Sequence, residues 1–177
     1  MNAPKALTTF MLVFLATACT AAPSLSAANS VTIYPAKECS IGVSTIGAAI
    51  AKKLDDQRIE LTWKAGQLSL KTELRFTCST AQLDQALSEA GFEQSKGKWM
   101  LSANGQNNKA LAVKTTTWSG FSGTYFQGNV CRAVVGESAN KSVTFTIDYC
   151  ISEQEYSKAS RQFELLERSV VLKPIQN

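Results

Sequence analysis

Histidine is absent from this sequence of 177 residues. The chain therefore lacks the side chain that most often acts as a general base at neutral pH and as a metal ligand. Asp, Glu, Lys, Tyr, Ser and Cys remain as the side chains that could carry chemistry. We expect no cofactor, no metal site and no enzymatic activity.

Long runs of one charge are also missing. The 18 Lys and Arg residues exceed the 14 Asp and Glu residues by four, and the longest basic run is the pair Lys52-Lys53. Domains that bind nucleic acid gather positive charge on one face or along one helix. So small and scattered an excess predicts no nucleic-acid partner.

The N-terminus has the pattern of an export signal. Lys5 precedes a mostly apolar stretch, and residues 1–18 together match a secretory signal peptide that is too short to span a membrane. The segment 15–19, LATAC, resembles a bacterial lipobox, which predicts cleavage before Cys19 and lipidation of that residue. Cleavage near Ala22 is the alternative. Residues 19–30 are small and polar and are expected to form a flexible tether.

The cysteines predict structural disulfides rather than a metal or redox centre. Five cysteines are present without any Cys-x-x-Cys pair, and four remain once Cys19 is lipidated or removed. Of the three possible pairings we predict Cys39–Cys78 and Cys131–Cys150. The second pair would join neighbouring antiparallel strands, and the first would enclose a helix and a hairpin.

The hydrophobic pattern predicts an α+β fold, with an antiparallel sheet of short strands and two or three helices on one face. Residues 31–177 are expected to form a single domain, and the polar stretch 103–109 is the best boundary between two lobes, 31–103 and 109–177. We expect helices from Ser40 or Ser44 to Asp56, after Thr80, and after a capping box at Ser152 and Glu155. Alternating apolar residues predict the strands, including a hairpin with arms at 58–63 and 68–76.

Catalytic motifs are not evident. No G-x-S-x-G sequence occurs, and no S-x-x-K sequence precedes a helix as a serine hydrolase requires. Glu153 and Glu155 suit the start of a helix, where carboxylates interact favourably with the helix dipole. A glycosidase would need two carboxylates brought together by the fold, and the sequence does not indicate which.

The stretch 118–128, WSGFSGTYFQG, is the best candidate for a binding surface. Glycines between large aromatic residues favour a loop whose rings lie on the surface, where they offer contact area at low entropic cost. The alternative is that these rings fold back into the core. The predicted binding residues are Trp118, Phe121, Tyr125 and Phe126.

Together these features predict a non-catalytic, exported envelope protein that recognises another envelope or exported protein, as an assembly accessory or an inhibitor or immunity-type factor. Its expected location is the periplasm, anchored to the membrane, preferably the outer membrane, through a lipid on Cys19. One alternative is a periplasmic carboxylate-dependent hydrolase that acts on cell wall or glycan. Another is a structural envelope lipoprotein.

Overall fold

The structure is a computed structural model that describes residues 30–175. The predicted signal peptide, Cys19 and almost all of the tether lie outside these residues and stay predictions.

The described chain is mostly β, with 58% of its residues in strands and 16% in two helices. The prediction of an α+β fold is therefore wrong. The main error is the helix expected to run to Asp56, where the structure has strands β2 (Cys39–Ser44) and β3 (Ile50–Lys53). In β2 the buried residues alternate, at Cys39, Ile41 and Val43, because β2 is the middle strand of its sheet and turns every second side chain toward the core. Of the apolar residues that supported helical spacing farther along, Ala49 is buried, whereas Ile46, Ile50 and Leu54 are exposed.

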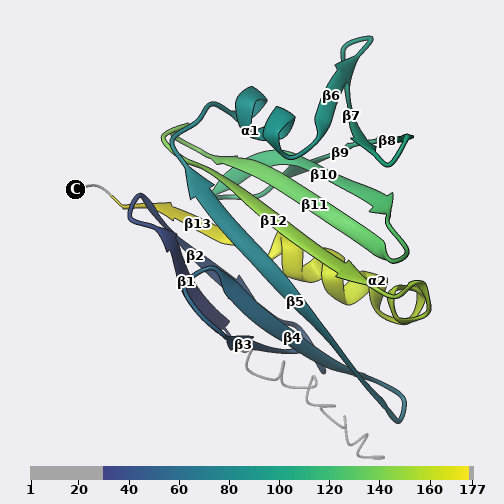
Figure 1. Cartoon of the computed structure of the whole chain (residues 1–177). Coiled ribbons are helices and arrows are strands. Elements are labelled where there is room, and N and C mark those ends of the chain that lie inside the picture. The colour runs from purple at the N-terminus through teal and green to yellow at the C-terminus, as the bar shows by residue number, and fades with distance from the viewer. Residues whose placement is uncertain (1–29, 176–177) are drawn as a thin grey trace, which may run out of the picture.

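All strands pair in antiparallel fashion in three sheets (Figure 1). The large sheet contains, in spatial order, β3, β4 (Arg58–Ala65), β5 (Leu68–Ser79), β12 (Thr144–Ile151), β11 (Val130–Ser138), β10 (Trp118–Phe126) and β9 (Leu111–Lys114). The small sheet contains β1 (Ser30–Ala36), β2 and β13 (Val171–Pro174), and the hairpin sheet contains β6 (Phe92–Ser95), β7 (Lys98–Ala103) and β8 (Gln106–Lys109). The large sheet takes strands from both predicted lobes.

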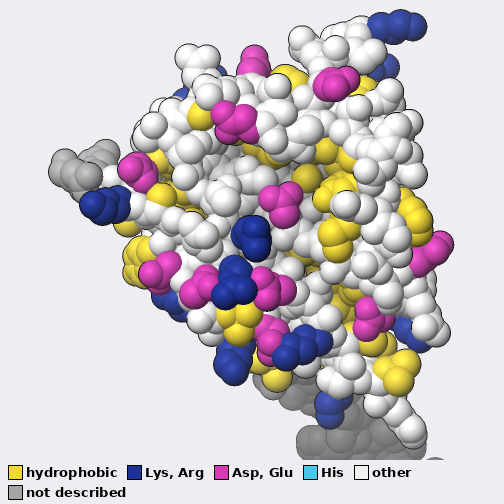
Figure 2. All heavy atoms as spheres, viewed as in Figure 1, with side chains coloured by type: hydrophobic (Ala, Val, Ile, Leu, Met, Phe, Trp, Pro, Cys, Tyr) yellow, Lys and Arg dark blue, Asp and Glu magenta, His cyan; other side chains and the backbone are white. Residues whose placement is uncertain are grey.

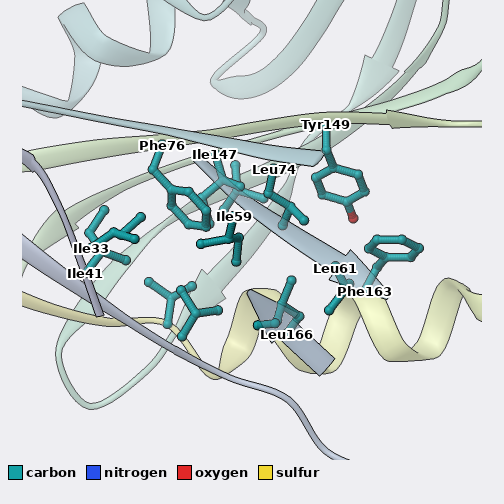
Figure 3. Close-up of a cluster of buried hydrophobic side chains, with 14 of the residues drawn as sticks. Ile33, Ile41, Ile59, Leu61, Leu74, Phe76, Ile147, Tyr149, Phe163 and Leu166 are labelled. Atoms are coloured by element: carbon teal, nitrogen blue, oxygen red, sulfur yellow. The ribbon is translucent and has the colours of Figure 1, made fainter. Parts of the chain in front are cut away.

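The main core lies between the large sheet and a layer formed by the small sheet and helix α2 (Glu153–Arg168). Figure 3 shows side chains from all three parts pointing toward one another, among them Ile41 of β2, Leu74 of β5 and Phe163 of α2. The Phe163 ring meets the Trp63 ring edge-on, with centroids 4.7 Å apart. We call this side of the large sheet its α2 face.

Helix α1 (Leu83–Glu89) and the hairpin sheet cover part of the opposite face, which we call the α1 face (Figure 1). A second core forms there from Leu87, Phe92, Leu101 and Val135. On the rest of this face, charged side chains pair across neighbouring strands, as Arg58 does with Glu73 and Lys71 with Glu60. Figure 2 shows such mixed positive and negative charge over β5 and its neighbours. The large sheet is thus buried on one face and partly solvated on the other.

Both predicted disulfides are confirmed. Cys39–Cys78 ties β2 of the small sheet to β5 of the large sheet, and Cys131–Cys150 joins directly opposed residues of β11 and β12. The helix start predicted at Ser152 is also confirmed: its hydroxyl accepts a hydrogen bond from the Glu155 N–H at 3.3 Å and donates one to the Glu155 carboxylate at 2.7 Å.

Candidate functional site

The stretch that was expected to be an aromatic loop forms the regular strand β10. Strand alternation divides its four rings between the two faces of the sheet, which a loop would not do. Trp118 faces α2 and is 1% exposed, with its ring edge-on to Phe145 and its Nε1–H donated to the Val170 carbonyl at 2.9 Å. Trp118 therefore belongs to the core.

Phe121 and Tyr125 point to the α1 face and are half-buried against the second core. The Phe121 ring lies 6.1 Å from the Trp99 ring, centroid to centroid. Phe126, at the end of the strand, is 44% exposed. Of the four predicted binding residues, the structure brings Tyr125 and Phe126 to one groove and places Trp118 and Phe121 elsewhere. Their role in binding stays a prediction.

This groove, which we call the edge groove, lies at the side of the large sheet where β8 separates from β10. Its volume is about 340 Å³. Its apolar walls include Leu111, Phe126 and Val130, and Leu111 is 60% exposed. The other lining residues are Gln106, Asn108, Lys109, Ser122, Thr124, Tyr125 and Arg132.

The backbone beside the edge groove has an open edge. The N–H of Thr115 donates to the Trp118 carbonyl at 2.9 Å, so these two residues form a hydrogen-bonded pair. Such pairs alternate along an antiparallel ladder, and the backbone of Ala112 and Lys114 must therefore point away from β10. Ala110 follows the same alternation, but its outward N–H is taken by the Trp99 carbonyl of β7 at 3.0 Å. In the described chain β9 pairs with β10 alone, which leaves the outward groups of Ala112 and Lys114 without a neighbouring strand.

Beyond the end of the ladder between β9 and β10, asparagine side chains bond to the backbone carbonyls of β10. The Asn108 amide donates to the Thr124 carbonyl at 2.9 Å, and the Asn104 amide donates to the Phe126 carbonyl at 3.1 Å. Asn104 has a positive φ of 52°, in the turn between β7 and β8. Asparagine tolerates this conformation better than most residues. Asn104 therefore both fits the turn and supplies the amide that bonds to β10.

A buried ion pair lies beneath the edge groove, and its Arg132 is part of the groove's floor. Arg132 is 6% exposed and Glu167 of α2 is 3% exposed. The guanidinium Nε and NH2 donate to the two carboxylate oxygens, each at 2.7 Å. NH2 also donates to Ser122, at 2.7 Å, while NH1 donates to Thr124 and Tyr156 at 3.0 and 3.1 Å. These bonds use all five N–H donors of Arg132, so it has none left for a ligand.

The electrostatics of the floor agree with a structural role. Burial opposes the charge on Arg132, but the hydrogen bonds and charge of Glu167 outweigh it and hold the arginine pKa above its ordinary value. Tyr149 donates to the Glu167 carboxylate at 2.7 Å, and burial followed by the Glu167 charge raises the pKa of the tyrosine well above its usual range. Arg132 therefore keeps its charge and Tyr149 keeps its proton at neutral pH, and their bonds to Glu167 fix α2 against β11 and β12.

A second groove lies on the α1 face, between the end of α1, the hairpin sheet and β11–β12. Its volume is about 310 Å³, and Tyr125, Glu89 and Asp148 are among its lining residues. Asp148 is an exposed residue, but its carboxyl is partly buried, and this burial raises the pKa of the carboxyl. The positive charge of Arg75, on the neighbouring strand, has the opposite and smaller effect. Burial, followed by the Asp148 charge, also raises the pKa of Tyr125.

Within residues 30–175, no group of three or more His, Cys, Asp or Glu residues is arranged to hold a metal ion. In the same part of the chain, no helix is long and apolar enough to cross a membrane.

Sequence reasoning missed the residues that build the edge groove. Arg132 and Glu167 are 35 positions apart, and no local pattern joins them. A signal did exist: Arg132 interrupts the apolar run VCRAVV of β11, where a charge needs a partner. The polar stretch 103–109 was predicted to be a boundary between lobes, but the structure places Asn104 in a turn and Asn108 in strand β8, and both amides bridge to β10.

Comparisons with known proteins identify no family. No protein-family model matches the chain, and no curated protein matches it. Among solved structures, it is similar to a crystal structure from Bacteroides thetaiotaomicron, with 9% sequence identity and a TM-score of 0.41 over 77% of this chain and 46% of that chain. The chain thus spans less than half of that protein, and a likeness this weak carries no functional argument.

Proposed function

We propose that this protein is a non-catalytic, exported binding protein of the bacterial envelope that recognises another exported or envelope protein, as an assembly accessory or an inhibitor or immunity-type factor. The observation that carries the proposal is the edge groove. There Leu111 and Phe126 expose apolar surface, 60% and 44% respectively, beside backbone groups that pair with no strand among residues 30–175. Apolar anchors next to an open sheet edge suit a protein partner.

The proposed location is the periplasm, with a lipid anchor at Cys19. The export-type N-terminus supports it. The two disulfides support it as well, because such bonds persist in oxidising compartments and are rare in the cytosol.

The test is capture of partners from the native envelope with the full-length protein and with Leu111→Ser/Phe126→Ser. Leu68→Ser is the matched control, since Leu68 is 53% exposed at the far β4–β5 turn. We expect a specific partner to be retained by wild type and control and lost by the groove variant. Its binding to purified protein should weaken by about tenfold or more. A partner list that is the same for all three proteins would show that the edge groove is not the binding surface.

A carboxylate-dependent hydrolase is the second candidate, and the groove on the α1 face favours it. Asp148 has a raised pKa there, and Glu89 lines the same groove. A carboxyl that protonates more readily than usual suits a general acid. Purified protein should then release soluble fragments from isolated cell walls, and Asp148→Asn should stop the release. No release by the wild type would remove this candidate.

A further inference from the structure

We infer that the partner binds by strand addition: an extended, acidic segment of another exported protein pairs with the outer edge of β9 and places an apolar side chain against the edge groove. This inference rests on the proposed function and specifies the partner for the same site. It can fail while the proposed function stands, because a protein could also bind the groove through side chains alone.

The backbone of β9 makes the first part of the argument. Ala112 and Lys114 each present an N–H and a C=O away from β10, by the alternation that the Thr115 and Ala110 hydrogen bonds fix. One of the backbone groups that point away from β10 is already bonded: the Ala110 N–H donates to the Trp99 carbonyl of β7, in the hairpin sheet. A strand entering beyond Trp99 would continue this pairing and satisfy the groups left open.

The apolar walls make the second part. Leu111 pairs with Ser122 and lies on the same face of the sheet as that residue. Side chains of an added strand would alternate between faces, so every second one would lie over Leu111 and at the mouth of the edge groove. A volume of about 340 Å³ accommodates one large apolar side chain together with part of its backbone.

The third part of the argument is the positive charge along β9, which favours an acidic partner. Lys109 precedes β9 and Lys114 is its last residue. Both are exposed, and neither has an ion-pair partner within the described chain. No acidic residue lines the edge groove. A segment with Asp or Glu on either side of its apolar residue would match this edge. The lysines would repel the same edge of a second copy, as charged edge residues commonly do.

The experiment selects peptides from a random phage-displayed library on the folded full-length protein. We expect enriched sequences to carry an apolar residue flanked by Asp or Glu. A synthetic enriched peptide should bind at least about tenfold more weakly when the backbone nitrogens facing β9 are methylated, because this removes hydrogen bonds and keeps the side chains. Amide signals of Ala112 and Lys114 should shift on binding in NMR spectra.

Protein variants supply the controls. Ala112→Pro removes an outward N–H and leaves the ladder to β10, so we expect it to abolish peptide binding. Lys53→Pro is the matched control at the opposite edge. There Leu54 donates inward to Arg58, which makes Lys53 an outward residue. Lys109→Glu/Lys114→Glu should reverse the peptide preference from acidic to basic.

The methylated peptide keeps the test decisive even if a proline variant fails to fold. Absence of enrichment, equal binding of the methylated peptide, or an unchanged charge preference in the double lysine variant would each overturn strand addition. So would a dimer of this chain that Ala112→Pro dissolves, since that would identify a second copy as the occupant. Failure of the wild-type protein to capture any specific envelope partner would instead overturn the proposed function.

Discussion

At the scale of single residues, the ion pair of Arg132 and Glu167 shows how this β-rich fold holds a charge inside. Their side chains are 7% and 4% exposed, and every guanidinium donor has an acceptor. Burial of a charge is costly unless the charge is paired and hydrogen-bonded. The pair therefore fixes the position of α2 and the floor of the edge groove more than it adds net stability.

Removing half of this pair should be strongly destabilising. We predict that Glu167→Gln lowers the free energy of unfolding by about 3–5 kcal/mol, because it leaves the buried Arg132 charge without its counter-ion. Urea unfolding followed by circular dichroism measures the loss. Glu73→Gln is the control, since Glu73 pairs with Arg58 at the surface and its loss should matter little. Equal effects of both changes would contradict the role of burial.

Asp148 should make the protein less stable as the pH rises, whereas a salt-bridged carboxylate makes a protein more stable as the pH rises. Its folded pKa lies above the ordinary value of 3.8, so the folded state favours the protonated form. Its contribution to stability is then complete below pH 3.8 and is lost as pH rises through the folded pKa. We predict that Asp148→Asn is more stable than wild type at neutral pH and that the difference vanishes below pH 3.8. A variant less stable than wild type at neutral pH would contradict this.

At the scale of elements, the sequence predicted strands correctly where apolar and polar residues alternate. The prediction failed where the apolar residues fit both the two-residue repeat of a strand and the three-to-four-residue spacing of a helix. Residues 58–63 and 68–76 form the expected hairpin because one face is buried and the other is charged. The segment that ends at Asp56 also contains apolar residues three and four apart, which imitates a helix. Pairing of β2 with both β1 and β13 decides for a strand, and β13 is more than 120 residues away. For the same reason local patterns could not predict the edge groove.

The two disulfides should differ in how easily they are reduced in the folded protein. Cys39 and Cys131 are both 0% exposed, but Cys150 is exposed on the α1 face, whereas Cys78 is partly buried against the main core. Thiol–disulfide exchange requires access to a sulfur, so we predict that a mild reductant opens Cys131–Cys150 first. Alkylation followed by peptide mass spectrometry should label Cys131 and Cys150 before Cys39 and Cys78. Labelling in the reverse order, while the protein is still folded, would contradict this.

At the scale of the whole molecule, the two faces and the two edges of the large sheet have different roles. The α2 face carries the main core and the Cys39–Cys78 bond, so the stability of the domain depends chiefly on it. The β3 edge lies beside the small sheet, and the β9 edge holds the apolar groove. The predicted tether, residues 19–30, would let a membrane-anchored domain present its β9 edge to a partner.

The membrane anchor itself is testable through Cys19. If the lipoprotein route is correct, Cys19→Ser should abolish labelling by radioactive fatty acid and release the protein from the membrane fraction. The fold should not change, because the four disulfide cysteines remain. Ala22→Arg is the matched variant: it should block cleavage only if a signal peptidase cuts near Ala22 and should leave a lipoprotein unaffected. Soluble, unlabelled wild-type protein whose processing fails in Ala22→Arg would show that the chain is exported without an anchor.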